Sequence, residues 1–138
     1  MRKLSFVYIA GPYRAKGGGH DATVYLEIDR NIAKAREAAA FLAQNLVPFF
    51  CPHLNSCHFE VIAPNTPPQY WYDLDMEILE HASAIWLIDG WENSGGALAE
   101  RDRANELGII NWMPNSGVEL VDWWKKNERG AEYLAIRA

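Results

Sequence analysis

The sequence predicts a single α/β domain over residues 1–138, built as a doubly wound parallel sheet of the Rossmann or flavodoxin-like kind. Two observations support this fold class. Short apolar runs alternate with segments whose apolar residues recur at helical spacing, in the order β-α-β-α-β-α-β-α. The apolar runs have the length and composition of buried strands, which favours about four to five parallel strands that helices cover on both faces.

The first strand and helix lie on either side of a long loop. Leu4–Ala10 is an apolar strand that ends at the turn signal Gly11-Pro12, and Tyr13–Ala22 follows as a loop. Val24–Gln44 is the first predicted helix, and Asn45 can end it. Its apolar positions recur at helical spacing: Ile28, Ile32, Ala35, Ala39 and Leu42.

The second unit contains the longest predicted connection. Leu46–Phe50 is expected to be a strand, and Cys51–Pro68 a loop with room for one short helical turn. Loops of that length are often functional. Gln69–His81 follows as a helix whose inward positions are Trp71, Leu74, Ile78 and Leu79.

The last two units are more compact. Ala84–Ile88 is a strand, and Gly95–Leu107 is a helix that Gly108 closes as the residue after its C-cap. Ile109–Met113 is the final strand, and Val118–Asn127 the final helix, which can dock through Val121 and Trp124.

Three segments are expected to meet at one crevice. In doubly wound sheets, ligands bind outside the carboxyl ends of the strands. The loops Gly11–His20 and Pro52–Pro67 and the turn at Ser94 all leave such ends.

The composition limits the classes of partner. The content is 49% hydrophobic and 22% charged, as in ordinary globular proteins, and the net charge of −5 argues against a nucleic-acid polymer. No apolar stretch approaches a membrane span and no signal peptide is recognised, so we expect a cytoplasmic protein with free thiols at Cys51 and Cys57.

Six tryptophans favour a homodimer or larger homo-oligomer, with Trp123-Trp124 as the expected contact.

The segment from Ser94 to Glu100 is the most informative motif. Ser94 can cap the following helix, and Gly95 and Gly96 let another molecule approach the backbone. The free N–H groups of that first turn and the helix dipole suit an anion such as phosphate. Glu100, six residues after the cap, can face the same crevice. A nucleotide whose glycosidic bond is attacked fits this spacing, although Ser-Gly-Gly turns and helical glutamates also occur without a function.

No cofactor or metal is expected. Cys51, His53, Cys57 and His58 are crowded together, whereas structural zinc sites pair two separated groups of ligands. His53 can instead line the pocket, and the role of the cluster stays open. The metalloprotease, nucleophile-elbow and phosphate-loop motifs are absent.

Four segments carry a resemblance to a known family. They are Tyr8–Arg14, Pro48–His53, Asp75–Leu79 and Ser94–Glu100. On these segments the chain resembles the nucleoside 2-deoxyribosyltransferase-like superfamily, and in particular its nucleoside 5′-monophosphate N-glycosidases.

The resemblance implies a set of roles. Glu100 would attack C1′ of the sugar, Tyr8 would orient that carboxylate, and Asp75 would bind or protonate the leaving base. Serine at position 94, where nucleoside transferases carry aspartate, and Arg14 imply a 5′-monophosphate ligand. Gly11, Tyr13, His53, Gly95 and Gly96 complete the expected binding residues.

Two other classes of function remain open at this stage. The same crevice could belong to a non-catalytic nucleotide-binding module in which Glu100 only binds a ribose hydroxyl. The tryptophans could instead mark the surface of an interaction protein. The base, the sugar, and the choice between hydrolysis and transfer are also open.

Overall fold

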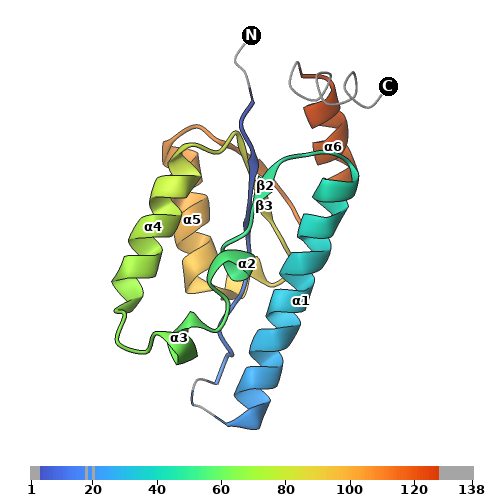
Figure 1. Ribbon diagram of the computed structural model, residues 1–138. Coiled ribbons are helices and arrows are strands. Elements are labelled where there is room, and N and C mark those ends of the chain that lie inside the picture. Colours follow the sequence, from blue (N-terminus) through green and yellow to red (C-terminus); the bar gives the residue numbers. More distant parts are fainter. Residues whose placement is uncertain (1–3, 18, 20, 128–138) are drawn as a thin grey trace.

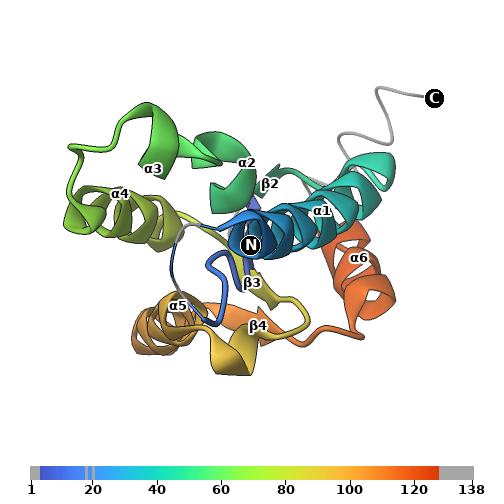
Figure 2. The ribbon, with the colours of Figure 1, turned by 90° about the horizontal axis from the view of Figure 1, so that it is seen from below.

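The protein contains a four-stranded, all-parallel sheet in the order β2-β1-β3-β4 (Figure 1). The computed structural model describes residues 4–17, 19 and 21–127. The strands are β1 (Val7–Ala10), β2 (Phe49–Phe50), β3 (Ala84–Leu87) and β4 (Ile110–Trp112). Helices lie on both faces of the sheet, which confirms the doubly wound α/β fold predicted from the sequence (Figures 1 and 2).

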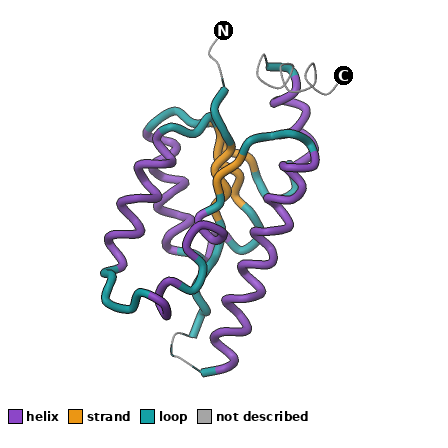
Figure 3. Tube along the Cα trace, in the orientation of Figure 1, coloured by secondary structure: helices purple, strands orange, loops and turns teal. Residues whose placement is uncertain are grey.

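Each predicted helix is present, with small differences at its ends. The helical elements are α1 (Ala22–Gln44), α2 (Pro52–Ser56), α3 (Phe59–Ile62), α4 (Pro68–Glu80), the 3-10 turn η1 (Trp91–Asn93), α5 (Gly95–Glu106) and α6 (Gly117–Lys125). The connection after β2 therefore holds two short helices where one turn was expected. His58, in the left-handed conformation with φ 63°, separates them. Figure 3 shows how little of the chain is strand.

Side-chain caps fix where α1 and α5 begin. Asp21 accepts a hydrogen bond from the Val24 N–H at the start of α1 (3.1 Å), and Ser94 accepts one from the Ala97 N–H at the start of α5 (3.2 Å). Both satisfy N–H groups that a helix leaves free at its first turn. The prediction that Ser94 caps its helix is thus confirmed.

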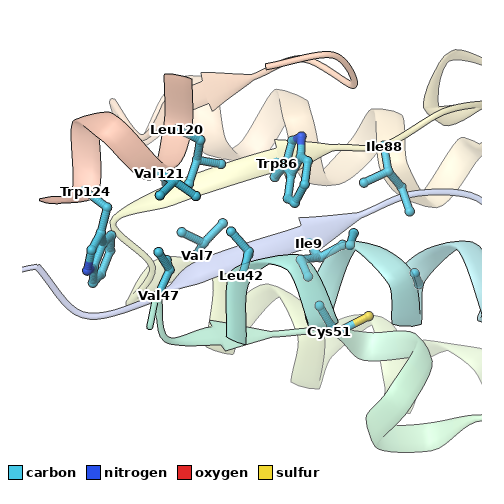
Figure 4. Packing of buried hydrophobic residues seen from close by; sticks show 14 of the residues in the cluster. Val7, Ile9, Leu42, Val47, Cys51, Trp86, Ile88, Leu120, Val121 and Trp124 are labelled. Carbon is cyan, nitrogen blue, oxygen red and sulfur yellow. The ribbon is translucent and has the colours of Figure 1, made fainter. Parts of the chain in front are cut away.

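One face of the sheet carries the larger core. Val7 and Ile9 of β1 and Trp86 of β3 point to this face, as the two-residue period of a strand requires. Helices α1 and α6 cover them, and Figure 4 shows the buried side chains of both helices gathered over β1 and β3. Trp124 of α6 is fully buried in this cluster and Trp123 packs against it. Trp124 is therefore not available as the subunit contact proposed for the Trp123-Trp124 pair.

The opposite face carries a smaller core under α4 and α5. Tyr8 and Ala10 of β1 alternate with the residues above and point to this side, where they meet Leu79 of α4 and Ala97 of α5. Small residues on α5 allow the helix to approach the sheet closely. A polar side chain on this face of α5 can therefore reach the sheet.

Helix α1 is much longer than the strands that it covers. At ~1.5 Å per residue its 23 residues span about 34 Å, whereas the four-residue strands span about 13 Å. Its N-terminal half extends beyond the carboxyl ends of the strands (Figure 1). Among the described residues, no helix combines the length and apolar character needed to cross a bilayer.

We expect Gly11→Ala to destabilise the protein. A Cβ atom at this buried position would lie 2.4 Å from Cγ1 and 2.8 Å from Cδ1 of Ile88, so the core would have to move. Overpacking of this kind costs roughly 1–3 kcal/mol. Calorimetry should show a lower Tm for Gly11→Ala. Gly95→Ala is the matched control, because nothing lies within 4 Å of its added methyl group. Equal melting of the two variants would contradict this role of Gly11.

Candidate active site

A cleft of about 590 Å³ opens at the carboxyl ends of the strands. Three regions line it: the β1–α1 loop with α1, the segment from α2 to α4, and the β3–α5 turn with α5. Figure 2 views the molecule from this end, with α1 and α5 on opposite sides of the sheet. The convergence of three loops predicted from the sequence is confirmed.

Glu100 lies at the inner wall of this cleft. The residue is only 8% exposed, and it projects from α5 toward β1. The Tyr8 hydroxyl donates a hydrogen bond to Oε2 of Glu100. Tyr8 is fully buried and is not among the residues that line the cleft, so its contact with the cleft runs through Glu100.

Burial shifts the pKa values of both carboxyl groups in the cleft. Burial raises the pKa of Glu100 to about 8; the Tyr8 hydrogen bond opposes this, and the charge of Asp75 adds to it. Burial also raises the pKa of Asp75 on α4 to about 6. The pKa of Tyr8 is raised by its burial and by both carboxylates, so its hydroxyl remains a donor at neutral pH. Carboxyl groups with separated pKa values in one cleft are a common arrangement for acid–base chemistry.

The N-terminus of α5 forms a second feature of the same wall. Ser94, Gly95 and Gly96 all line the cleft, and the space beside Gly95 is open. Backbone N–H groups at a helix N-terminus attract anions. Glu92, which could repel an anion there, is exposed and does not line the cleft.

Hydrogen bonds fix the loop that carries Tyr13 and Arg14. The buried Asn31 amide on α1 donates to the carbonyl oxygens of Tyr13 (3.1 Å) and Arg14 (3.5 Å). The Tyr13 hydroxyl donates to the Glu60 carboxylate and accepts a hydrogen bond from the His58 N–H (2.7 Å). This loop is thereby joined to both α1 and the α2–α3 segment.

His53 is a buried wall residue. Its Nε2 lies 2.8 Å from the Pro12 carbonyl oxygen, and burial lowers its pKa, so the neutral ring donates this hydrogen bond. Burial also raises the pKa of the Cys51 thiol to about 11. His58 pairs instead with Asp29 (3.0 Å). In the part of the chain that the structure describes, no group of three or more His, Cys, Asp or Glu side chains is arranged to hold a metal ion.

The structure brings every residue expected at the site to one place. Nine line the cleft: Gly11, Tyr13, Arg14, His53, Asp75, Ser94, Gly95, Gly96 and Glu100. Tyr8 lies behind Glu100.

Sequence reasoning missed two sets of lining residues. Aromatic side chains from α3 and α4 form one of them: Phe59, Trp71 and Tyr72. Polar and charged residues of α1 form the other: Glu27, Arg30, Asn31 and Lys34. The helical spacing of the four α1 residues is visible in the sequence, but it is the same as that of any solvated helix face. Only the length of α1 relative to the sheet places them in a cleft.

The comparisons with known proteins place the chain in a family. Residues 5–112 match the family described as Domain of unknown function (DUF7768), and the chain belongs to that family. The matched range includes all the strands and all the residues of the candidate site. No curated protein matches the chain.

We expect Glu100→Gln to stabilise the folded protein at alkaline pH. The folded-state pKa of about 8 exceeds the ordinary value of 4.5, so the folded state favours the protonated form. The free energy of unfolding of the wild type therefore falls as pH rises from about 4.5 through about 8. The fall is roughly 1.4 kcal/mol for each pH unit between these two pKa values. Glutamine cannot ionise and escapes this loss.

Thermal melts between pH 4 and pH 9 provide the measurement. The Tm of Glu100→Gln should exceed that of the wild type by an amount that grows up to about pH 8 and then levels off. Glu37→Gln, at an exposed position of α1, is the matched control. A constant Tm difference across the pH range would show that Glu100 is not held protonated by burial.

Proposed function

We propose that this member of the DUF7768 family cleaves or transfers at the N-glycosidic bond of a nucleoside or deoxynucleoside 5′-phosphate. The observation that carries the proposal is the arrangement on α5. One helix presents a buried carboxylate, hydrogen-bonded by Tyr8, and an N-terminus suited to phosphate in the same cleft. The resemblance to nucleoside 2-deoxyribosyltransferase-like proteins supports the same chemistry.

Glu100 acts as the nucleophile in the first step. An Oε atom attacks C1′ of the sugar and forms an ester bond, while the bond from C1′ to the base nitrogen breaks. The base leaves with the electron pair of that bond and takes a proton from Asp75. Tyr8 holds the carboxylate of Glu100 in place throughout.

A second acceptor resolves the covalent species. In hydrolysis, Asp75 accepts a proton from water as the oxygen attacks C1′, and Glu100 leaves as carboxylate. The sum of the two steps is nucleotide plus water giving free base and sugar phosphate. In transfer, the nitrogen of a second base takes the place of the water oxygen.

The aromatic side chains of α3 and α4 suit the base. Phe59 and Trp71 contact each other edge to face, with ring centroids 5.3 Å apart, and both line the cleft near Asp75. Flat rings of this kind bind a nucleobase through its face. We place the activity in the cytoplasm, where free thiols such as Cys51 and Cys57 persist.

Chromatography of nucleotides incubated with the protein should detect free base, and Glu100→Gln should release none while still binding the nucleotide.

With a 2-fluoro-arabinosyl analogue, intact-mass spectrometry should show one sugar adduct per chain, located on Glu100 by peptide mapping. An adduct on Asp75 would reverse the two roles. Nucleotide binding without any base release by the wild type would favour the non-catalytic binding module.

The pH dependence of kcat/KM should be bell-shaped, with limbs near pH 6 and pH 8. The mechanism needs one proton on the pair, because Glu100 must be ionised and Asp75 protonated. The free site holds the proton mainly on Glu100, whose pKa is the higher one, so the active form is a minor one.

Asp75→Asn tests this assignment. On a substrate with an easily expelled base, this variant should retain an acid limb, because Glu100 must still ionise, but that limb should move from near pH 6 toward the pKa of Glu100. It should lose the alkaline limb, because no proton on residue 75 remains to be lost. A complete loss of turnover, or an unchanged bell, would contradict the roles given to the two carboxyl groups.

A further inference from the structure

The cleft has a strongly basic wall formed by Arg14, Lys16, Arg30 and Lys34. Arg14 and Lys16 come from the β1–α1 loop, and Arg30 and Lys34 from α1. All four side chains line the cleft that contains Glu100. This basic wall stands out in a protein whose net charge is −5.

Local structure holds these cations on one side of the cleft. Residues 27, 30, 31 and 34 recur at helical spacing and all line the cleft, so they share one face of α1. The Asn31 side chain, on that face, donates a hydrogen bond to the Arg14 carbonyl oxygen and so holds the loop backbone against the helix. The Lys16 N–H donates to the Glu27 carboxylate (3.3 Å), which fixes the other end of the loop.

Within the described part of the chain, none of the four cations forms an ion pair with a carboxylate. Among residues 4–17, 19 and 21–127, arginine and lysine ion pairs are formed by Arg101, Arg103 and Lys126, all outside the cleft. Glu27 and Glu60 also line the cleft; they accept hydrogen bonds from the Lys16 N–H and the Tyr13 hydroxyl, and within the described residues neither is ion-paired with these cations. Like charges gathered without partners repel each other, and a bound polyanion would relieve that repulsion.

The cleft thus has two separate regions that attract anions. The N-terminus of α5 lies on one face of the sheet and α1 on the other, with the β1–α1 loop between them (Figure 2). A nucleoside monophosphate has one anionic group, which leaves most of the second region without a ligand. A chain of phosphates can occupy both.

We propose that the substrate is a nucleoside 5′-diphosphate or 5′-triphosphate, whose distal phosphates bind the basic wall. This inference rests on the proposed function for the position of the sugar. The phosphate attached to the sugar lies at the N-terminus of α5, and the following phosphates extend to Arg30 and Lys34. Guanidinium and ammonium groups suit phosphate oxygens through charge-assisted hydrogen bonds. Cleavage at C1′ leaves the phosphate chain intact on the sugar.

Calorimetric titration with inorganic tripolyphosphate and orthophosphate tests the basic wall without knowledge of the base. Tripolyphosphate should bind the wild type at least tenfold more tightly than orthophosphate, and more weakly as salt is added. The double variant Arg30→Gln/Lys34→Gln should lose at least tenfold in tripolyphosphate affinity. Arg36→Gln is the matched control, because it removes an exposed α1 cation that does not line the cleft. Equal affinity for the two anions, or equal losses in both variants, would overturn the proposal.

Turnover of mono-, di- and triphosphates of the same nucleosides is the second arm. Base release from the di- or triphosphate should exceed that from the monophosphate by at least tenfold in kcat/KM, and Arg30→Gln/Lys34→Gln should reduce this ratio. Equal or faster release from the monophosphate would overturn the polyphosphate assignment and leave the proposed function standing. Release from none of them would reject the proposed function, while tripolyphosphate binding would still decide whether the basic wall is a polyphosphate site.

Discussion

The hydrogen bond from Tyr8 to Glu100 is the contact on which the candidate site depends. Tyr8 belongs to the fully buried strand β1, and Glu100 to the helix that covers it, so the bond joins the sheet to the cleft. Small residues such as Ala97 and Ala104 let α5 lie close enough for this contact. The same burial that fixes the carboxylate also makes its ionisation unfavourable, which gives it a pKa suited to chemistry at neutral pH.

The two faces of the sheet serve different purposes at this site. The face under α1 and α6 contains the larger apolar cluster, which includes Trp86 and Trp124, and it contributes neither carboxyl group of the cleft. The face under α4 and α5 is smaller, and both carboxyl groups project from its helices. The protein thus places the two carboxyl groups of the cleft on the face with the smaller apolar cluster, while the larger cluster on the other face buries more apolar side chains.

The sequence predicted the fold and much of the site because the determining signals are local. The cap at Ser94, the apolar runs of the strands and the helical spacing of α1 each involve few neighbouring residues. Other features depend on contacts between distant segments. Gly11 lines the cleft as expected, but its local sequence does not show that Ile88 fills the space where a side chain would lie. Trp124 docks α6 on the core, as its helical spacing predicted, but only the tertiary packing shows that this burial removes it from the pair expected at a subunit contact.

The unequal lengths of α1 and the sheet separate the part of the helix that borders the cleft from the part that packs in the core. Apolar residues in the second half of α1, such as Ala35, Ala39 and Leu42, hold the helix on the sheet. The first half extends past the strands and borders the cleft with side chains that contribute little to the core. Substitutions at the exposed positions of that overhang, such as Arg30 and Lys34, can therefore accumulate without loss of the native state. A family built on this scaffold can diversify in ligand choice by changing a single helical overhang, while its folding determinants remain the same.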